Sequence, residues 1–153
     1  MCCDYRVMTS DVAGATIGLN EVALGISVPR YWIQLYIAQL GLTRAEQALM
    51  TGRMLTPEEA VAGGLLHAAV PKSDLMSTAE KALAGFLRNP DAGRVLTKMD
   101  SRRVLAAQWQ AYCKEEAQNA WAVLESPQVT QVLGGVLAKL SGGAAGAAPK
   151  SKL

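Results

Sequence analysis

The middle of the chain carries two helix-start signals of the same kind, and they constrain its fold more than any other feature. The stretches "TRAE" (43–46) and "TPEE" (56–59) each place a threonine three residues before a glutamate, the arrangement of a capping box. Pro57 adds the residue favoured at the first helical position. The sequence therefore predicts two short helices, which end near Gly52 and at Gly63–Gly64.

Extended segments are predicted on both sides of these helices. "YRVMTS" (5–10) is rich in β-branched and aromatic residues, "DVAG" supplies turn residues, and "ATIGLNEV" (15–22) returns as a second strand. "LLHAAVP" (65–71) is a short apolar run bounded by glycine and proline, which favours a buried strand. The pattern predicts a β-turn-β opening and a later buried strand that contains His67 as a partly buried residue.

The remaining segments have helical spacing. Helices are predicted over 30–40, over 73–87, over 92–125 as one or two long helices, and from Ser126 to Leu140. The residues expected to face inward on the long helices are Leu96, Val104, Leu105, Trp109, Tyr112 and Trp121.

Composition excludes several classes of function. The 153 residues suffice for one domain, and the net charge of +2 comes from scattered basic and acidic residues, so dedicated nucleic-acid binding is not expected. No apolar run approaches the roughly 20 residues that span a membrane. Cys2, Cys3, Cys113 and His67 have no metal-ligand spacing, and the cysteines are interpreted as reduced, partly buried thiols.

Glu21 is the first candidate catalytic residue, because it is an ionisable group inside the apolar stretch "ATIGLNEVALGISVP". A carboxylate at a strand end among apolar neighbours loses hydration, which suits a general base that must later return its proton. The alternative is a structural carboxylate that caps Val28–Pro29 or faces water. Pattern alone favours this alternative, because structural carboxylates outnumber catalytic ones.

Two longer stretches resemble the second half of the crotonase (enoyl-CoA hydratase/isomerase) superfamily. They are "CDYRVM…IGLNEVALGI…P" and "GLTRAEQALMTGRMLTPEEAVAGGLLHAAVP", and the resemblance runs through residues 3–140. Within the superfamily the chain is most similar to the Δ3,Δ2-enoyl-CoA isomerase (dodecenoyl-CoA isomerase) group. Tyr31 and Trp32 stand where hydratases have a glycine-rich turn, which favours the isomerase over the hydratase.

The resemblance implies an α/β fold that is mostly helical in this fragment. Residues 1–70 are expected to be a remnant of the crotonase-type ββα spiral core, and residues 71–140 the C-terminal helical region that makes trimer contacts. Residues 141–153 are expected to form a flexible tail that ends in Ser151, Lys152 and Leu153.

The resemblance also implies a reaction in fatty acid β-oxidation. Glu21 would take a proton from C2 of a 3-enoyl-CoA and return it at C4, with coenzyme A as part of the substrate and no further cofactor. In the family the donors to the thioester oxygen come from segments before the "CDYR" strand, so the N-terminal half is expected to be missing here. Loss of one such donor costs roughly 3 kcal/mol, so little catalysis is expected from this chain alone.

The sequence leaves two alternative functions open and contains one possible targeting signal. The chain could be a 2-enoyl-CoA hydratase, or a non-catalytic assembly module that joins full-length trimers. Lys98, Arg102 and Arg103 could approach the phosphates of coenzyme A or form a solvated helix face, so no residue is assigned to its binding. The C-terminal "SKL" matches the address read by the peroxisomal import receptor and predicts a peroxisomal location, with the mitochondrion as the alternative.

Overall fold

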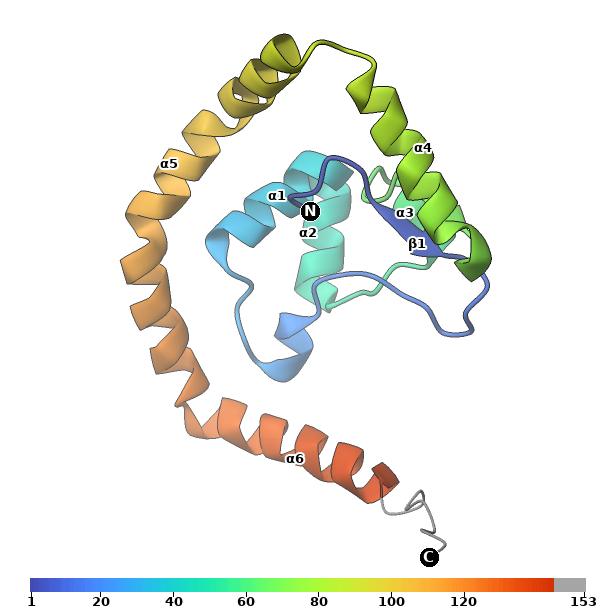
Figure 1. Cartoon of the computed structure of the whole chain (residues 1–153). Coiled ribbons are helices and arrows are strands. Elements are labelled where there is room, and N and C mark those ends of the chain that lie inside the picture. Colours follow the sequence, from blue (N-terminus) through green and yellow to red (C-terminus); the bar gives the residue numbers. More distant parts are fainter. Residues whose placement is uncertain (145–153) are drawn as a thin grey trace, which may run out of the picture.

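The computed structural model describes residues 1–144 as a compact α/β part around which two long helices run (Figure 1). Ser151, Lys152 and Leu153 lie outside the described residues. The strands are β1 (Val7–Thr9) and β2 (Ala68–Val70). The helices are α1 (Arg30–Leu40), α2 (Leu42–Thr51), α3 (Pro57–Ala62), α4 (Leu75–Leu87), α5 (Asp91–Leu124) and α6 (Pro127–Ala144), with short 3-10 helices η1 (Glu21–Leu24) and η2 (Lys72–Asp74).

The two strands pair in parallel, so the predicted β-turn-β opening is wrong. Val7 lies opposite Ala68 and Thr9 opposite Val70, and α1 to α3 form the crossover that a parallel pair requires. The segment 15–22 does not pair with β1. It makes a single antiparallel bridge between Ile17 and Leu55 and then turns into η1.

The two capping-box sequences have different outcomes. Thr56 Oγ1 accepts a hydrogen bond from Glu59 N (3.2 Å) and Glu59 Oε2 accepts one from Thr56 N (3.0 Å), so the predicted box at α3 is confirmed. The box at 43–46 is wrong, because α2 begins at Leu42 and Thr43 lies within its first turn. Gly41, at φ 77°, joins α1 directly to α2, so this helix begins before the threonine.

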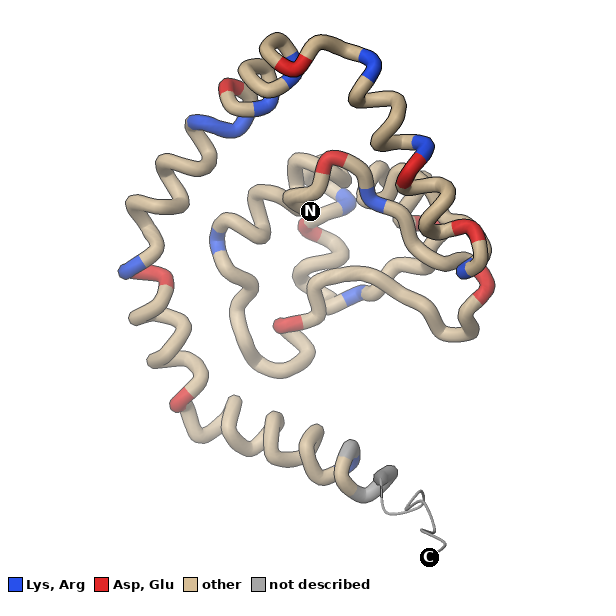
Figure 2. The backbone as a smooth tube through the Cα atoms, in the orientation of Figure 1, with Lys and Arg blue, Asp and Glu red and all other residues tan. Residues whose placement is uncertain are grey.

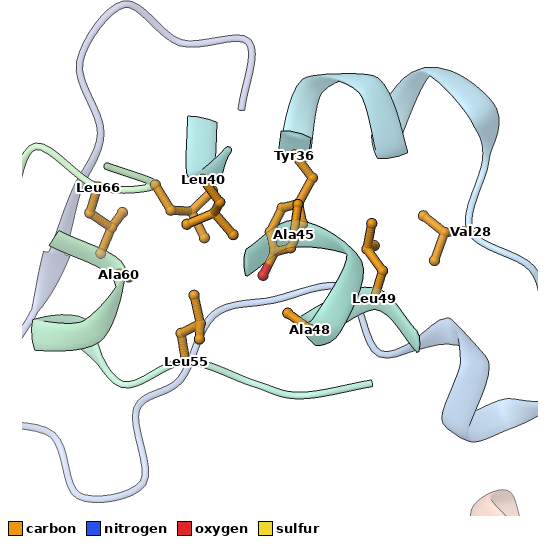
Figure 3. Packing of buried hydrophobic residues seen from close by; sticks show 10 residues of the cluster. Val28, Tyr36, Leu40, Ala45, Ala48, Leu49, Leu55, Ala60 and Leu66 are labelled. Atoms are coloured by element: carbon orange, nitrogen blue, oxygen red, sulfur yellow. The ribbon is translucent and has the colours of Figure 1, made fainter. Parts of the chain in front are cut away.

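The hydrophobic core lies between α1, α2, α3 and the segment that leads into β2 (Figure 3). Tyr36 and Leu65 are its largest fully buried side chains. Gly63 permits close packing here, because a Cβ at this position would lie 2.7 Å from Leu40 Cδ2. The other buried members are Val28, Leu40, Ala45, Ala48, Leu49, Leu55, Ala60 and Leu66.

The long helix α5 is one continuous element with no buried residue, so much of its predicted inward face is wrong. The exposed fractions of Leu96, Val104 and Trp121 are 59%, 66% and 63%. Trp109 and Tyr112 are half-buried because both rings contact Tyr31, with ring centroids 5.6 Å and 5.8 Å away. Within residues 1–144, no helix is long and apolar enough to cross a membrane.

Arg6 connects the start of β1 to the rest of the core. Its guanidinium donates hydrogen bonds to the Leu65 carbonyl (2.6 Å), to Gln39 Oε1 (2.5 Å) and to the Cys3 carbonyl (3.1 Å). Its backbone N–H donates to His67 Nδ1 (3.1 Å), and its carbonyl accepts from His67 N (2.9 Å). One residue therefore joins β1, the end of α1 and the segment before β2.

His67 is exposed just before β2 rather than partly buried within it. Its ring stacks on Tyr5, with centroids 4.8 Å apart. The partial loss of hydration of the ring, and secondarily the charge of Arg6, lower the pKa of His67 below its ordinary value. The neutral imidazole is also the form that accepts the hydrogen bond from Arg6 N.

Replacing the confirmed cap tests its contribution against the threonine that is not a cap. We expect Thr56→Ala to lower the free energy of unfolding by about 1 kcal/mol, because the N–H of Glu59 loses its acceptor. Thr43→Ala is the matched control and should change stability by less than about 0.5 kcal/mol. Urea denaturation measures both, and equal losses in the two variants would contradict the assignment.

Acid titration tests the contact between Arg6 and His67. As the pH falls below about 6.5, the ordinary pKa of histidine, the unfolded chain takes up a proton that the folded chain resists, so the free energy of unfolding should decrease. His67→Asn keeps an acceptor for Arg6 N and does not titrate, so its stability should vary less over this range. The lowered pKa values of Asp4 and Asp11 act at more acidic pH. Identical pH profiles for both chains would contradict this prediction.

Candidate active site

Glu21 is the first residue of η1, not the end of a strand as predicted. The turn is closed by Gly25, which adopts the left-handed conformation at φ 73° and donates its N–H to the Val22 carbonyl (3.1 Å). Ile26 N donates to the Glu21 carbonyl (3.0 Å). These bonds fix the backbone on both sides of the carboxylate.

The η1 turn is held between the end of α2 and the start of α6. A Cβ on Gly52 would lie 3.3 Å from Val22 Cγ2, so only glycine permits this approach without a shift. On the other side, Val129 is 2% exposed, and its Cγ2 lies 3.7 Å from where a Cβ on Gly25 would be. The sequence predicts that a helix follows Ser126, but nothing in its local pattern places Val129 against a turn far away in the chain.

The Glu21 carboxylate has the surroundings of a possible base. The residue is half-buried, and Oε2 is buried with no hydrogen-bond partner in the described chain. A buried polar atom without a partner is costly, and such atoms call for an explanation such as a catalytic role. A carboxylate so placed can take a proton from a bound molecule and return it. Across residues 1–144, no three His, Cys, Asp or Glu side chains are grouped to hold a metal ion.

Glu21 lines neither of two cavities in the described part of the chain. The larger has a volume of about 1020 Å³ and lies between residues 1–6, α4 and the first half of α5. The smaller, of about 310 Å³, is lined by residues of α1, α2, α3 and the segment between α2 and α3. A substrate held at Glu21 would therefore lie outside both of these cavities.

Figure 2 shows several basic residues along α5, and Lys98, Arg102 and Arg103 of this helix form ion pairs. Lys98 Nζ and Arg102 Nη2 lie 2.5 Å and 2.6 Å from the two carboxylate oxygens of Asp4, while Arg103 pairs with Asp100 on its own helix. The hydrogen bond from Lys98 is the main cause that lowers the pKa of Asp4. A contact between these cations and coenzyme A stays a prediction.

The chain is similar in sequence to known enoyl-CoA isomerases. The chain is 34% identical over 140 residues to "Enoyl-CoA delta isomerase 1, mitochondrial" of Mus musculus, which covers 92% of the chain and 48% of the relative. It is 33% identical over 132 residues to the Homo sapiens protein of the same name, which covers 86% of the chain and 43% of the relative. The chain therefore spans about half the length of the curated relatives it matches.

These relatives contradict the predicted location. The names of the mouse, rat and human proteins all state that they are mitochondrial. The peroxisomal location inferred from Ser151, Lys152 and Leu153 is therefore wrong. A three-residue motif can occur at a chain end by chance, whereas the mitochondrial relatives match most of the chain.

Solved structures match the fold. "Human mitochondrial delta3-delta2-enoyl-CoA isomerase" superposes with a TM-score of 0.85 at 31% identity, over 91% of this chain and 54% of that one. Carnitinyl-CoA hydratase from Mycobacterium avium has a TM-score of 0.71 at 17% identity, over 89% and 52% of the two chains, which shows a shared fold alone. The predicted α/β, mostly helical, crotonase-type fragment is confirmed.

The family itself follows from a match over nearly all of the described chain. The enoyl-CoA hydratase/isomerase family matches residues 1–139, which include η1, the parallel strand pair and α1 to α5. The residues that carried the resemblance in sequence lie within this range. The chain therefore belongs to the enoyl-CoA hydratase/isomerase family.

Proposed function

We propose that this chain carries the catalytic base of a Δ3,Δ2-enoyl-CoA isomerase of fatty acid β-oxidation, and that Glu21 is that base. The observation that carries the proposal is the Glu21 Oε2 atom, which is buried and without a partner in the described residues, on a turn closed by Gly25. The identity of about a third to enoyl-CoA delta isomerases of mouse and human supports the isomerase over the 2-enoyl-CoA hydratase.

The proposed reaction is a 1,3-proton transfer by one carboxylate. Glu21 takes a proton from C2 of the 3-enoyl thioester, and the electron pair of the C–H bond moves toward the thioester oxygen to give a dienolate. The protonated carboxyl then delivers the proton to C4, and the double bond becomes C2=C3 in the trans form. One base serves both steps because C2 and C4 lie on either side of the same double-bond carbon, within reach of one positioned carboxylate.

The developing negative charge on the thioester oxygen requires hydrogen-bond donors. Because the chain spans about half the length of its relatives, we propose the activity for the whole protein, with other residues supplying these donors and the pocket for the acyl chain. The location proposed with this activity is the mitochondrion, which the names of the mouse, rat and human relatives support.

A chimeric enzyme tests the role of Glu21. Residues 1–139 of this chain replace the matching segment of the mouse relative, and conversion of a 3-enoyl-CoA to the 2-enoyl-CoA is followed. We expect Glu21→Gln to lower kcat by at least about 100-fold, because the amide keeps the shape of the carboxyl and cannot shuttle a proton. Glu46→Gln, an exposed carboxylate on α2, is the matched control and should leave kcat unchanged.

Three outcomes would contradict the proposal. The first is a Glu21→Gln chimera that keeps most of its kcat. The second is water addition to a 2-enoyl-CoA that is faster than isomerisation, which would favour the hydratase. The third is turnover by the 153-residue chain alone at the level of the chimera, since no other residues would then be needed to supply the donors.

We also propose that copies of this chain associate through the long helices. The exposed apolar side chains of these helices support this role. The half of the chain proposed to carry the site is residues 1–70, and residues 71–140 are proposed to join copies into a trimer. Exposed apolar surface of this extent is typical of an interaction site. The exposed residues on α5 and α6 are Val95, Leu96, Met99, Val104, Trp121, Leu124, Val132, Val136 and Leu137.

Light scattering during size-exclusion chromatography tests this association. We expect the 153-residue chain to elute as an oligomer, and Val104→Glu or Trp121→Glu to shift it toward the monomer, because a charge at an apolar contact loses hydration. Met50→Glu is the matched control, since Met50 is 80% exposed on α2 and outside the long helices. A monomeric starting chain, or equal effects of all three variants, would contradict this role.

A further inference from the structure

The larger cavity brings two neighbouring thiols together with several cations. Cys2 and Cys3 are exposed free thiols, and both line this space of about 1020 Å³. Their exposure differs from the predicted partial burial. Arg6, which directly precedes β1, and Arg94 from α5 also line it. Two thiols that face the same cavity as several cations have more positive charge around them than thiols scattered on an open surface.

The cations of the cavity outnumber its acids. Lys98 and Arg102 share the single carboxylate of Asp4, which is the only acidic residue that lines the cavity in the described chain. Arg94 pairs with Asp91 through Nη2 (2.6 Å), but its Nε is buried and has no hydrogen-bond partner among the described residues. The surplus positive charge raises the local concentration of small anions in such a space.

The thiols are held at the cavity by their neighbours in the chain. Arg6 Nη1 donates a hydrogen bond to the Cys3 carbonyl (3.1 Å). Asp4, the next residue, is tied to α5 through both of its ion pairs. These contacts hold the segment at Cys3 and Asp4, next to the cations of α5.

We propose that the Cys2–Cys3 pair is a modification site for anionic low-molecular-weight disulfides, which the cations of the larger cavity attract. The thiolate sulfur of one cysteine attacks one sulfur of the disulfide, the S–S bond breaks, and a mixed disulfide forms. The other half of the reagent leaves as a thiolate and takes up the proton, so the cysteine is oxidised and that half is reduced. This site does not depend on the isomerase activity.

Cys113 provides a matched thiol within the same chain. It is also exposed and free, but it lies on α5 outside the cavity. Lys114, Glu115 and Glu116 follow it in the sequence. The acidic residues outnumber the basic one in this stretch, so anions should gain no comparable advantage there.

Three single-thiol chains test the proposal. Cys2 alone, Cys3 alone and Cys113 alone are made by cysteine-to-serine changes at the other two positions, and mass spectrometry follows the mixed disulfide. Glutathione disulfide is the anionic probe and bis(2-hydroxyethyl) disulfide the neutral one. We expect the ratio of anionic to neutral rate at Cys2 or Cys3 to exceed that at Cys113 by about tenfold in low salt and to approach it in about 1 M salt.

Charge variants and a second anionic disulfide test whether the cations of the cavity cause the preference for anions. Arg94→Gln should lower the ratio at Cys2 or Cys3 several-fold, whereas Arg44→Gln, an exposed arginine on α2, should not. Coenzyme A disulfide carries phosphates instead of carboxylates, so it shows which kind of anion the site prefers. A higher ratio of anionic to neutral rate at Cys2 or Cys3 than at Cys113, with either anionic disulfide, supports the proposal. Equal ratios at all three thiols, or ratios that salt and Arg94→Gln leave unchanged, would overturn the proposal.

Discussion

The compact part of this chain depends on one guanidinium. Each strand has three residues, too few to be stable as an isolated pair, so other contacts must fix their register. Arg6 supplies them by donating to the carbonyls of Leu65 and Gly64, on the segment that enters β2, and to Gln39 at the end of α1. Because its guanidinium is planar and carries five donors, one side chain satisfies acceptors from several segments at once.

From this junction the position of η1 follows. With β1 and β2 fixed side by side, the crossover through α1, α2 and α3 must fold back over the strands. The bridge between Ile17 and Leu55 then places the segment before η1 against the segment before α3. The end of α2 comes so close to η1 that Gly52 leaves no room for a side chain without a shift. The orientation of Glu21 is therefore a consequence of tertiary packing, although the residue itself was identified by its apolar neighbours.

Sequence reasoning succeeded where a signal is local and failed where a distant segment decides. The box at Thr56 is confirmed because its two hydrogen bonds join residues within one turn. The same pattern at Thr43 is wrong because Gly41 lets α1 continue almost directly into α2. The β-turn-β opening is wrong because the partner of β1 lies some sixty residues away, at Ala68. Helical spacing predicted the range of α5 closely. Periodicity could not indicate that Leu96 is exposed, because that depends on which segments pack against the helix.

The charged residues of the chain are distributed differently around Glu21 and around the cavity that contains Cys2 and Cys3. The cations that line the larger cavity are Arg6 and residues of α5, whereas none of the ion pairs in residues 1–144 involves Glu21. A cation beside a carboxylate favours its ionised form and makes it reluctant to accept a proton, which would weaken a base that must hold a proton between two steps. Glu21 Oε2 is buried and has no hydrogen-bond partner among the described residues, so this oxygen stays available to a bound molecule. The same segregation leaves Asp4 as the only carboxylate that lines the cavity around Cys2 and Cys3 in the described chain, so the cations of this cavity outnumber its acids.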